Sequence, residues 1–350
     1  MSEFDVRVVE VGHLAKHENA DSLSVTMVDG YPVIVRTGDF SEADRAIYVP
    51  IDSVVPDVPE WAFLGGHRRI KAKRLRGIFS MGLLAHLPPC ECQPLWDAQV
   101  GGEWKLVDGT FHDRSCSKTW SAGQNVQNEM KIEKWEPTIH AGKIRPEDQE
   151  PEQPFLPRYT DIEGLRRHGD VLVLGEEVVL TEKIHGANGR WLFRDGRLWI
   201  GSHNCLWKEG TSNIWTRVAD GYLGHALVDV PGLAFYGEVF GDVQDLKYGR
   251  SQGTLCLMVF DVMDTSTLRY LDHDEATEVC DRLGFLRVPV LYRGPWSDEL
   301  YLLAEGMTTV SGGHVREGFV VKPTRERFDH RVGRVILKLI GEGYLLRKGA

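Results

Sequence analysis

Short apolar runs separated by turn residues fill the N-terminal quarter of the chain. Residues 5–17, 23–36, 46–56 and 77–88 alternate or cluster Val, Ile and Leu, and Gly, Pro and Asp-Gly pairs interrupt them. Runs of this length with these interruptions are typical of β-strands. Several such strands in so short a stretch predict a small Greek-key barrel of the OB type.

Apolar runs of strand length also dominate the chain from residue 158 onwards. They are not separated by regular crossover helices, and only residues 159–169 and 275–285 have helical patterns. The first of these helices has Thr160 or Asp161 as its expected N-cap. We therefore expect an α+β domain of antiparallel sheets with flanking helices.

The two patterned regions are separated by a segment rich in Pro, Glu and Gln and poor in apolar residues. Such a composition is typical of a linker. The sequence thus predicts an OB-type nucleic-acid-binding domain at residues 1–136, a linker at 137–157 and a second domain at 158–350.

Composition narrows the class of protein. No apolar run is long enough for a membrane helix, and the acidic N-terminus lacks the apolar region of a secretory signal. Six cysteines in 350 residues suggest no disulfide framework, so we expect a cytoplasmic protein without membrane contacts. A C-x-C pair at Cys90 and Cys92, with His112 and Cys116 nearby, lacks a second paired motif and favours ordinary loop cysteines over zinc.

One basic segment stands out in a chain whose net charge is −10. Residues 67–76 read HRRIKAKRLR, and two interpretations are open: a solvated hairpin face, or a patch that contacts nucleic-acid phosphates. The candidate phosphate-binding residues are Arg68, Arg69, Lys71, Lys73, Arg74 and Arg76.

Charged residues follow apolar runs repeatedly in the second domain. They are Lys183, Glu238, Asp261, Glu317, Lys322 and Lys338. Six such residues predict one polar cleft onto which the strands open. Lysines neutralise phosphate oxygens, carboxylates hold divalent metal, and a lysine with a lowered pKa can act as a nucleophile. We expect Lys322 and Lys338 to lower the pKa of Lys183 in this way.

Five ordered motifs resemble those of the covalent nucleotidyltransferases, the superfamily of ATP-dependent ligases and mRNA capping enzymes. Residues 183–188, KIHGAN, are similar to motif I, K-x-[DH]-G-x-N. FYGEVFG, VFDV, EGFVVKP and VILKLI follow in the order of motifs III, IIIa, IV and V. The histidine at position 185 is similar to that of nick-sealing phage and RNA-editing RNA ligases.

The N-terminal region carries a second resemblance. VGHLAKHENADSLSV and KAKRLRGIFSMGLL, within residues 6–87, resemble the OB-type tRNA-binding module found beside some aminoacyl-tRNA synthetases. An OB-type domain placed before the transferase resembles a bacterial RNA ligase. This implies an ATP-dependent enzyme that seals 3′-OH and 5′-phosphate ends or nicks through a lysyl-AMP intermediate, in RNA repair. The implied partners are ATP, Mg²⁺ or Mn²⁺, and RNA or an RNA-containing nicked duplex, with the protein acting as a monomer.

The resemblance also implies a role for each matched residue. Lys183 would attack the α-phosphate of ATP, and His185 and Asn188 would serve the later steps. The remaining roles are adenine recognition by Glu182, stacking on adenine by Phe260, ribose and metal binding by Glu238, metal binding by Glu317, and contacts to the α-phosphate by Lys322 and Lys338.

Two departures from the family pattern leave alternatives open. His203 stands where an arginine usually contacts the ribose, which leaves Arg190 as a substitute. Motif V usually has two lysines, whereas this chain has Lys338-Leu339-Ile340, with Arg347 and Lys348 as candidate replacements. The alternatives are a non-catalytic RNA-binding protein with a decayed transferase domain, or a GTP-dependent or DNA-directed nucleotidyltransferase. His185 and the domain order argue against the latter two.

Overall fold

The computed structural model describes residues 4–87, 105–107, 110–112, 120–135 and 145–347 of the chain. The chain divides into two compact units between residues 136 and 137, and each is described by itself. Cys90, Cys92 and Cys116, considered above for zinc, lie outside the described residues.

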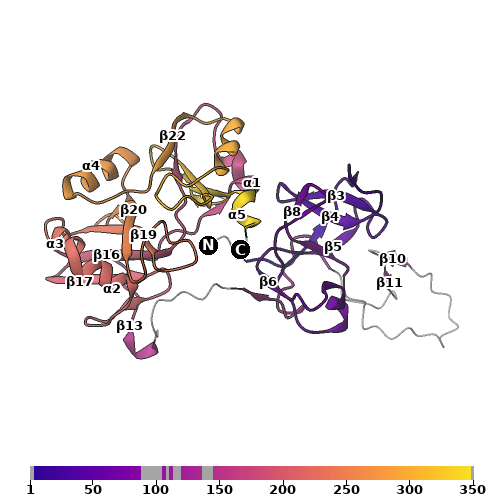
Figure 1. The fold of residues 1–350 in the computed structure, drawn as a ribbon, viewed down its shortest axis with the longest axis horizontal. Helices are drawn as coiled ribbons and strands as arrows, with labels where there is room; N and C mark the ends of the chain where they lie inside the picture. Colours follow the sequence, from indigo (N-terminus) through magenta and orange to yellow (C-terminus); the bar gives the residue numbers. More distant parts are fainter. Residues whose placement is uncertain (1–3, 88–104, 108–109, 113–119, 136–144, 348–350) are drawn as a thin grey trace. The chain divides into compact units, whose positions relative to one another are not determined.

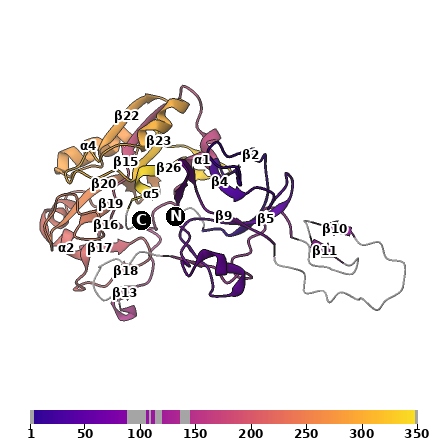
Figure 2. The same cartoon turned by 45° about the vertical axis from the view of Figure 1, so that its right-hand side comes forward.

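The N-terminal unit consists of short antiparallel strands (Figures 1 and 2). Its two three-stranded sheets have the orders β1-β5-β9 and β2-β3-β4, and β6 pairs with β12, β7 with β8 and β10 with β11. The elements are β1 (Arg7–Glu10), β2 (Ala15–Lys16), β3 (Leu23–Val28), β4 (Tyr31–Arg36), β5 (Arg45–Val49), β6 (Ser53–Val54), the 3-10 helix η1 (Pro59–Leu64), β7 (Lys73–Leu75), β8 (Ile78–Ser80), β9 (Leu83–Ala85), β10 (Lys105–Val107), β11 (Thr110–His112) and β12 (Glu133–Lys134).

Strand β5 lies between two apolar cores. Ile47 and Val49 face one core, and Ala46 and Tyr48 face the other. Successive side chains of a strand point to opposite faces, so a strand buried on both faces carries a continuous apolar run. This explains why residues 46–49 show no polar alternation.

Two tight turns fix hairpins in this unit. Asp29 and Gly30 connect β3 to β4 with φ values of 53° and 74°, and Arg76 and Gly77 connect β7 to β8 with φ values of 45° and 95°. Two consecutive positive φ values match the twist of a hairpin. The second turn places Arg76 at the tip of the basic segment.

The C-terminal unit contains two large sheets. One has the order β13-β18-β17-β16-β19-β20-β21 and the other β14-β26-β23-β15-β22, and all pairs are antiparallel except β14 with β26. The strands are β13 (Gln149–Glu150), β14 (Glu163–Gly164), β15 (Glu177–Glu182), β16 (Ala187–Arg194), β17 (Arg197–Ser202), β18 (Leu206–Trp207), β19 (Leu233–Gly241), β20 (Leu255–Asp264), β21 (Arg269–Tyr270), β22 (Val290–Pro295), β23 (Gly318–Pro323), β24 (Phe328–Asp329), β25 (Gly333–Arg334) and β26 (Leu337–Ile340).

Short helices cover the seven-stranded sheet on one face (Figures 1 and 2). Trp191, Phe235 and Val262 of that face pack in one core with residues of α2, α3 and α4, while Leu192 and Tyr236 belong to a core on the other face. The helices are α1 (Leu165–His168), α2 (Ile214–Val218), α3 (Gly224–Leu227), α4 (His273–Leu283) and α5 (Glu342–Leu345), with 3-10 helices η2 (Pro146–Asp148), η3 (Gly169–Val171) and η5 (Asp298–Ala304) and the π-helical turn η4 (Ala219–Leu223).

The expected α+β architecture, with an OB-type domain followed by antiparallel sheets, is confirmed. Two details differ. The helix expected after Thr160 begins only at Leu165, with Gly164 as its N-cap and no side-chain cap. Residues 145–157, expected to belong to a linker, lie against the C-terminal unit: β13 pairs with β18, and Leu156 is fully buried.

Candidate active site

The loop at residues 183–186 connects the two large sheets. β15 of the five-stranded sheet ends at Glu182, and β16 of the seven-stranded sheet begins at Ala187. Backbone N–H of Lys183 donates to Gly318 O at 3.0 Å, which ties the loop to β23. A Cβ at Gly186 would lie 2.2 Å from Val239 O, so only glycine permits the loop to approach β19 this closely.

Lys183 lies in this loop with its ammonium group against a carboxylate. Its Nζ is 2.6 Å from Glu317 Oε1, and its side chain is 27 % exposed. Burial lowers the pKa of Lys183, but Glu317 and Glu238 raise it more, so the pKa stands above the ordinary value of 10.5. The prediction that neighbouring lysines lower this pKa is therefore wrong, because the charged groups that act on Lys183 are carboxylates.

Glu238 and Glu317 face the loop from different sheets and have opposite pKa shifts. Burial, with Glu317 nearby, raises the pKa of Glu238 to about 8, against the effect of Lys183. Glu317 is also buried, yet Lys183 and His185 hold its pKa down at about 2. The two buried carboxyl groups of the site therefore differ in how readily each gives up its proton.

Both ring nitrogens and the backbone N–H of His185 have hydrogen-bond partners. Its Nε2 lies 2.7 Å from Asp245 Oδ1, its Nδ1 lies 2.8 Å from Tyr344 Oη, and its backbone N–H donates to Tyr248 Oη at 2.7 Å. The motif pattern gave no signal for Asp245, Tyr248 or Tyr344. They come from the segment after β19 and from α5, and only the fold brings them to the loop.

A second charged cluster lies in the same unit and is buried. Lys322 donates to Asp261 and, at 2.9 Å, to Glu326, and Arg334 forms an ion pair with Asp261 at 2.9 Å and with Glu326 at 2.6 Å. Tyr159 donates to Asp261. Lys322 is 5 % exposed and its partners here are protein carboxylates, and its contact with the α-phosphate stays a prediction. The charged strand-end residues accordingly divide between two clusters, whereas the sequence predicted one cleft.

Phe260 occupies a bulge in β20. The register with β19 shifts between Tyr236 and Gly237. Asp261 is paired with Tyr236 and Val259 with Gly237, so Phe260 is the additional residue of β20. Bulges redirect side chains and occur often near active sites. The ring of Phe260 contacts that of Tyr159, with 4.7 Å between centroids. Its stacking on adenine stays a prediction, as does the contact of Lys338, on β26 opposite Val320, with phosphate.

Two other candidate residues, Glu182 and Arg190, hydrogen-bond to other residues of the protein. Glu182 accepts hydrogen bonds from the Thr308 hydroxyl and from both the backbone N–H and the hydroxyl of Thr309. Arg190 is fully buried, and its guanidinium donates to Leu156 O and Glu152. Arg190 therefore anchors residues 152–156, and its suggested role as a ribose contact is wrong for this arrangement. The adenine contact of Glu182 stays a prediction.

The carboxylates fit a hydrated divalent cation. Within the described residues, no group of three or more His, Cys, Asp or Glu side chains forms an all-protein metal site. Two buried acceptors beside the loop, Glu317 Oε2 and Asn188 Oδ1, have no hydrogen-bond partner in the described part of the chain. Mg²⁺ and Mn²⁺ are bound through one or two carboxylates, waters and substrate phosphates, and Glu317 with Glu238 would suffice for that mode.

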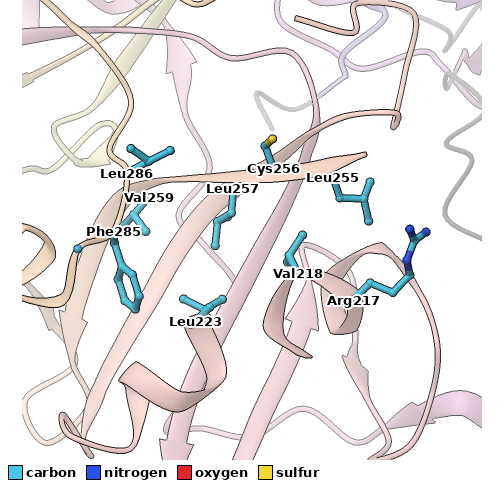
Figure 3. A pocket seen from close by; sticks show the side chains of 10 residues that line it. Arg217, Val218, Leu223, Leu255, Cys256, Leu257, Val259, Phe285 and Leu286 are labelled. Carbon is cyan, nitrogen blue, oxygen red and sulfur yellow. The ribbon is translucent and has the colours of Figure 1, made fainter. Parts of the chain in front are cut away.

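An apolar pocket in the same unit is not part of this site. Arg217, Leu223 and Phe285 line it together with Leu257 and Val259 of β20, and its volume is about 290 Å³ (Figure 3). Met258, between the last two, is paired with Glu238 and shares its face of the sheet. Leu257 and Val259 therefore point to the opposite face, away from the loop that carries Lys183.

The basic segment of the N-terminal unit forms an exposed hairpin. Five of its candidates are exposed: Arg68, Lys71, Lys73, Arg74 and Arg76. Arg69 differs, because its guanidinium forms an ion pair with Asp52 at 2.6 Å and lies 3.3 Å from the centroid of the Trp135 ring. His17 and Asn19 hydrogen-bond to the backbone carbonyls of Leu75 and Arg76, so the two segments that carry the tRNA-binding resemblance lie together.

Comparisons with known proteins match both units. Residues 176–340 match the RNA ligase family model, and residues 6–87 match an OB-fold domain model. No match was found among curated proteins. Among the described residues, no helix is long and apolar enough to span a membrane.

Solved structures of Naegleria gruberi RNA ligase have the same fold. A mutant with ATP and Mn is 21 % identical with a TM-score of 0.75, and the alignment covers 98 % of both chains. The form with PPi is 21 % identical over 99 % of this chain and 98 % of that chain, with a TM-score of 0.74. A mutant with AMP and Mn is 21 % identical over 98 % of both chains, with a TM-score of 0.75. At this identity the likeness concerns the fold.

Proposed function

We propose that the protein is an ATP-dependent RNA ligase, because residues 176–340 match the RNA ligase family model and residues 6–87 match an OB-fold domain model. It seals 3′-OH and 5′-phosphate ends through a lysyl-AMP intermediate. The observation that carries the proposal is the position of Lys183, in the loop between the two sheets and among Glu317, Glu238 and His185.

Lys183 is the nucleophile in this proposal. Its ammonium group first loses a proton, and Nζ then attacks the α-phosphorus of ATP. A nitrogen–phosphorus bond forms, the bond to the bridging oxygen breaks, and pyrophosphate leaves. Glu317, 2.6 Å from Nζ, orients the amine, and the close contact of Gly186 with β19 fixes the loop. In-line displacement at phosphorus depends chiefly on positioning and on neutralised charge.

The later steps use the same site. AMP passes from Lys183 to a 5′-phosphate, and a 3′-OH then attacks that phosphate and releases AMP. We assign His185 and Asn188 to these steps from the motif resemblance; His185 lies in the loop that carries Lys183, and Asn188 is the second residue of β16, which follows that loop. A divalent cation bound through Glu317 and Glu238 would supply charge neutralisation for the phosphates.

The N-terminal unit binds the nucleic acid in this proposal. Its segment at residues 71–76, which leads into the β7–β8 hairpin, is basic, whereas the whole chain carries a net charge of −10. Phosphate contacts of this kind give affinity without sequence preference. We further propose a monomer acting in RNA repair in the cytoplasm, and the free thiols of Cys205, Cys256 and Cys280 suit a reducing compartment.

The test is a sealing assay on nicked duplexes that differ in the strand with the 3′-OH. With ATP and Mg²⁺ or Mn²⁺, the protein should seal a nick whose 3′-OH strand is RNA, and Lys183→Ala should not. Sealing of all-DNA nicks alone would contradict the RNA assignment. Label transferred to the protein only from GTP would indicate a capping-type enzyme, and no label from either nucleotide would indicate a binding protein.

A further inference from the structure

The ring of His185 is held by residues that the motif pattern does not include. Asp245 lies in the segment after β19, and Tyr344 lies in α5, near the end of the described chain. Asp245 Oδ1 is 2.7 Å from Nε2, and Tyr344 Oη is 2.8 Å from Nδ1. Two contacts on opposite nitrogens fix both the position of an imidazole ring and the orientation of its plane.

The two elements that hold the ring are also joined to each other. Arg347 forms an ion pair with Asp245 at 3.1 Å, and its guanidinium lies 3.6 Å from the centroid of the Tyr344 ring. Gln244, beside Asp245, donates to Gly186 O, and Tyr248 Oη accepts from the backbone N–H of His185. The loop that carries Lys183 is therefore enclosed by a clamp formed by residues 244–248 and 344–347.

The partners of the ring specify its hydrogen bonds. A carboxylate only accepts, so the contact with Asp245 requires a proton on Nε2, which donates to Asp245. Nδ1 hydrogen-bonds to the Tyr344 hydroxyl. On the Nδ1 side, Glu317 Oε2 lies 3.5 Å away, and the other oxygen of Glu317 holds Lys183. The orientation of the His185 ring is therefore set beside the same carboxylate that holds Lys183.

Stability alone does not account for these contacts. The side chain of Asp245 is 48 % exposed, and ion pairs at such exposure contribute little to folding. Tyr248, which holds the backbone of the same loop, has a φ of 49°, a left-handed conformation that is unfavourable for a non-glycine residue. Backbone strain of this kind is concentrated at functional sites.

We propose that Asp245 and Tyr344 are positioning residues for the ligase reaction, which act by holding the ring of His185. The inference rests on the proposed function. Partners that orient metal-binding histidines typically contribute about ten- to a hundredfold, and we expect an effect near the lower end of that range for His185. Because the two residues act through His185, their removal should matter only while His185 is present.

The experiment compares Tyr344→Phe and Asp245→Asn with His185→Ala, alone and combined. Enzyme labelling from ATP, AMP transfer from the labelled enzyme to a nicked RNA duplex, and sealing of a nick whose 5′-phosphate already carries AMP are timed separately. We expect Tyr344→Phe to slow, by about tenfold, the same steps that His185→Ala slows. Asp245→Asn keeps an acceptor oxygen and should lose less than Asp245→Ala. Neither Tyr344→Phe nor Asp245→Asn should slow His185→Ala further.

Controls separate positioning from folding and from the proposed function itself. Tyr292→Phe removes a hydroxyl that donates to Pro295 O on β22, and it should leave every step unchanged. Thermal unfolding should show the Tyr344→Phe variant folded. Wild-type rates in Tyr344→Phe, slowing of other steps, or a full further loss in the double variant would overturn the inference. An unlabelled wild-type enzyme would overturn the proposed function instead.

Discussion

At the scale of single residues, the environment of Lys183 decides when the amine can react. Carboxylates raise its pKa, so most of the enzyme holds an ammonium group at neutral pH. The structure therefore places the nucleophile in an oriented but charged form, and loss of its proton must accompany the reaction. This differs from the sequence-based expectation of a lysine neutralised by neighbouring cations.

Glu317→Gln should lower the pKa of Lys183. The variant removes the nearest negative charge, which raises that pKa in the wild type, while burial, which lowers the pKa, remains. The pH dependence of Lys183 modification by a small amine reagent, followed by peptide mass spectrometry, measures the change. Glu299→Gln, on the exposed end of η5, should leave the profile unchanged. A profile shifted to higher pH in Glu317→Gln would contradict the account.

A candidate residue could be found from the sequence only where it lies next to a recognisable local pattern, such as an apolar strand. Lys183, Glu238 and Glu317 each follow or precede an apolar strand, and the structure brings all three together. Asp245 and Tyr344 have no such pattern. Their contacts depend on loop paths, which local periodicity does not determine.

At the scale of elements, the buried cluster joins β20, β23 and β25 within the C-terminal unit. Asp261 accepts from Lys322 and Arg334, and these cations hold the pKa of its carboxyl well below the ordinary value despite burial. A carboxylate whose pKa is lowered on folding stabilises the fold above its unfolded pKa. The contribution is lost as the pH falls through the folded value.

Asp261→Ala should therefore destabilise the protein by about 3 kcal/mol or more, because two buried cations lose a shared partner. Urea unfolding of both proteins at several pH values measures the effect. The difference should be full at neutral pH and should shrink below about pH 4, where the wild type begins to lose its advantage. Asp170→Asn, which removes a surface partner of Arg331, should barely change stability. Equal losses in the two variants would argue against the cluster.

Strands were easier to predict from the sequence than the contacts between residues that are distant in the sequence. The β-rich pattern predicted antiparallel sheets correctly, as in the β16–β17 hairpin, where Asp195 and Gly196 both have positive φ. The polar composition of residues 145–157 suggested a linker. Composition could not reveal that Leu156 is buried or that Glu152 pairs with Arg190, because these partners are distant in the sequence.

At the scale of the whole molecule, we assign nucleic-acid binding to the N-terminal unit and adenylylation to the C-terminal unit. Lys71→Ala with Lys73→Ala should weaken binding to a nicked duplex and reduce the salt dependence of that binding, by about one unit of slope per lost phosphate contact. Labelling from ATP should remain unchanged, because these lysines belong to the N-terminal unit. Arg36→Ala with Lys131→Ala removes the same charge from exposed positions of that unit outside the two resembling segments and serves as the control. Equal effects in both pairs would indicate net charge rather than a binding hairpin.

The most direct test of the account is to find where AMP becomes attached. The protein is incubated with ATP and Mg²⁺ or Mn²⁺, digested under conditions that preserve phosphoramidates, and mapped by mass spectrometry. The account predicts one AMP adduct, on Lys183, that is absent from a folded Lys183→Ala variant. An adduct on another residue, or an adduct that persists in Lys183→Ala, would contradict it.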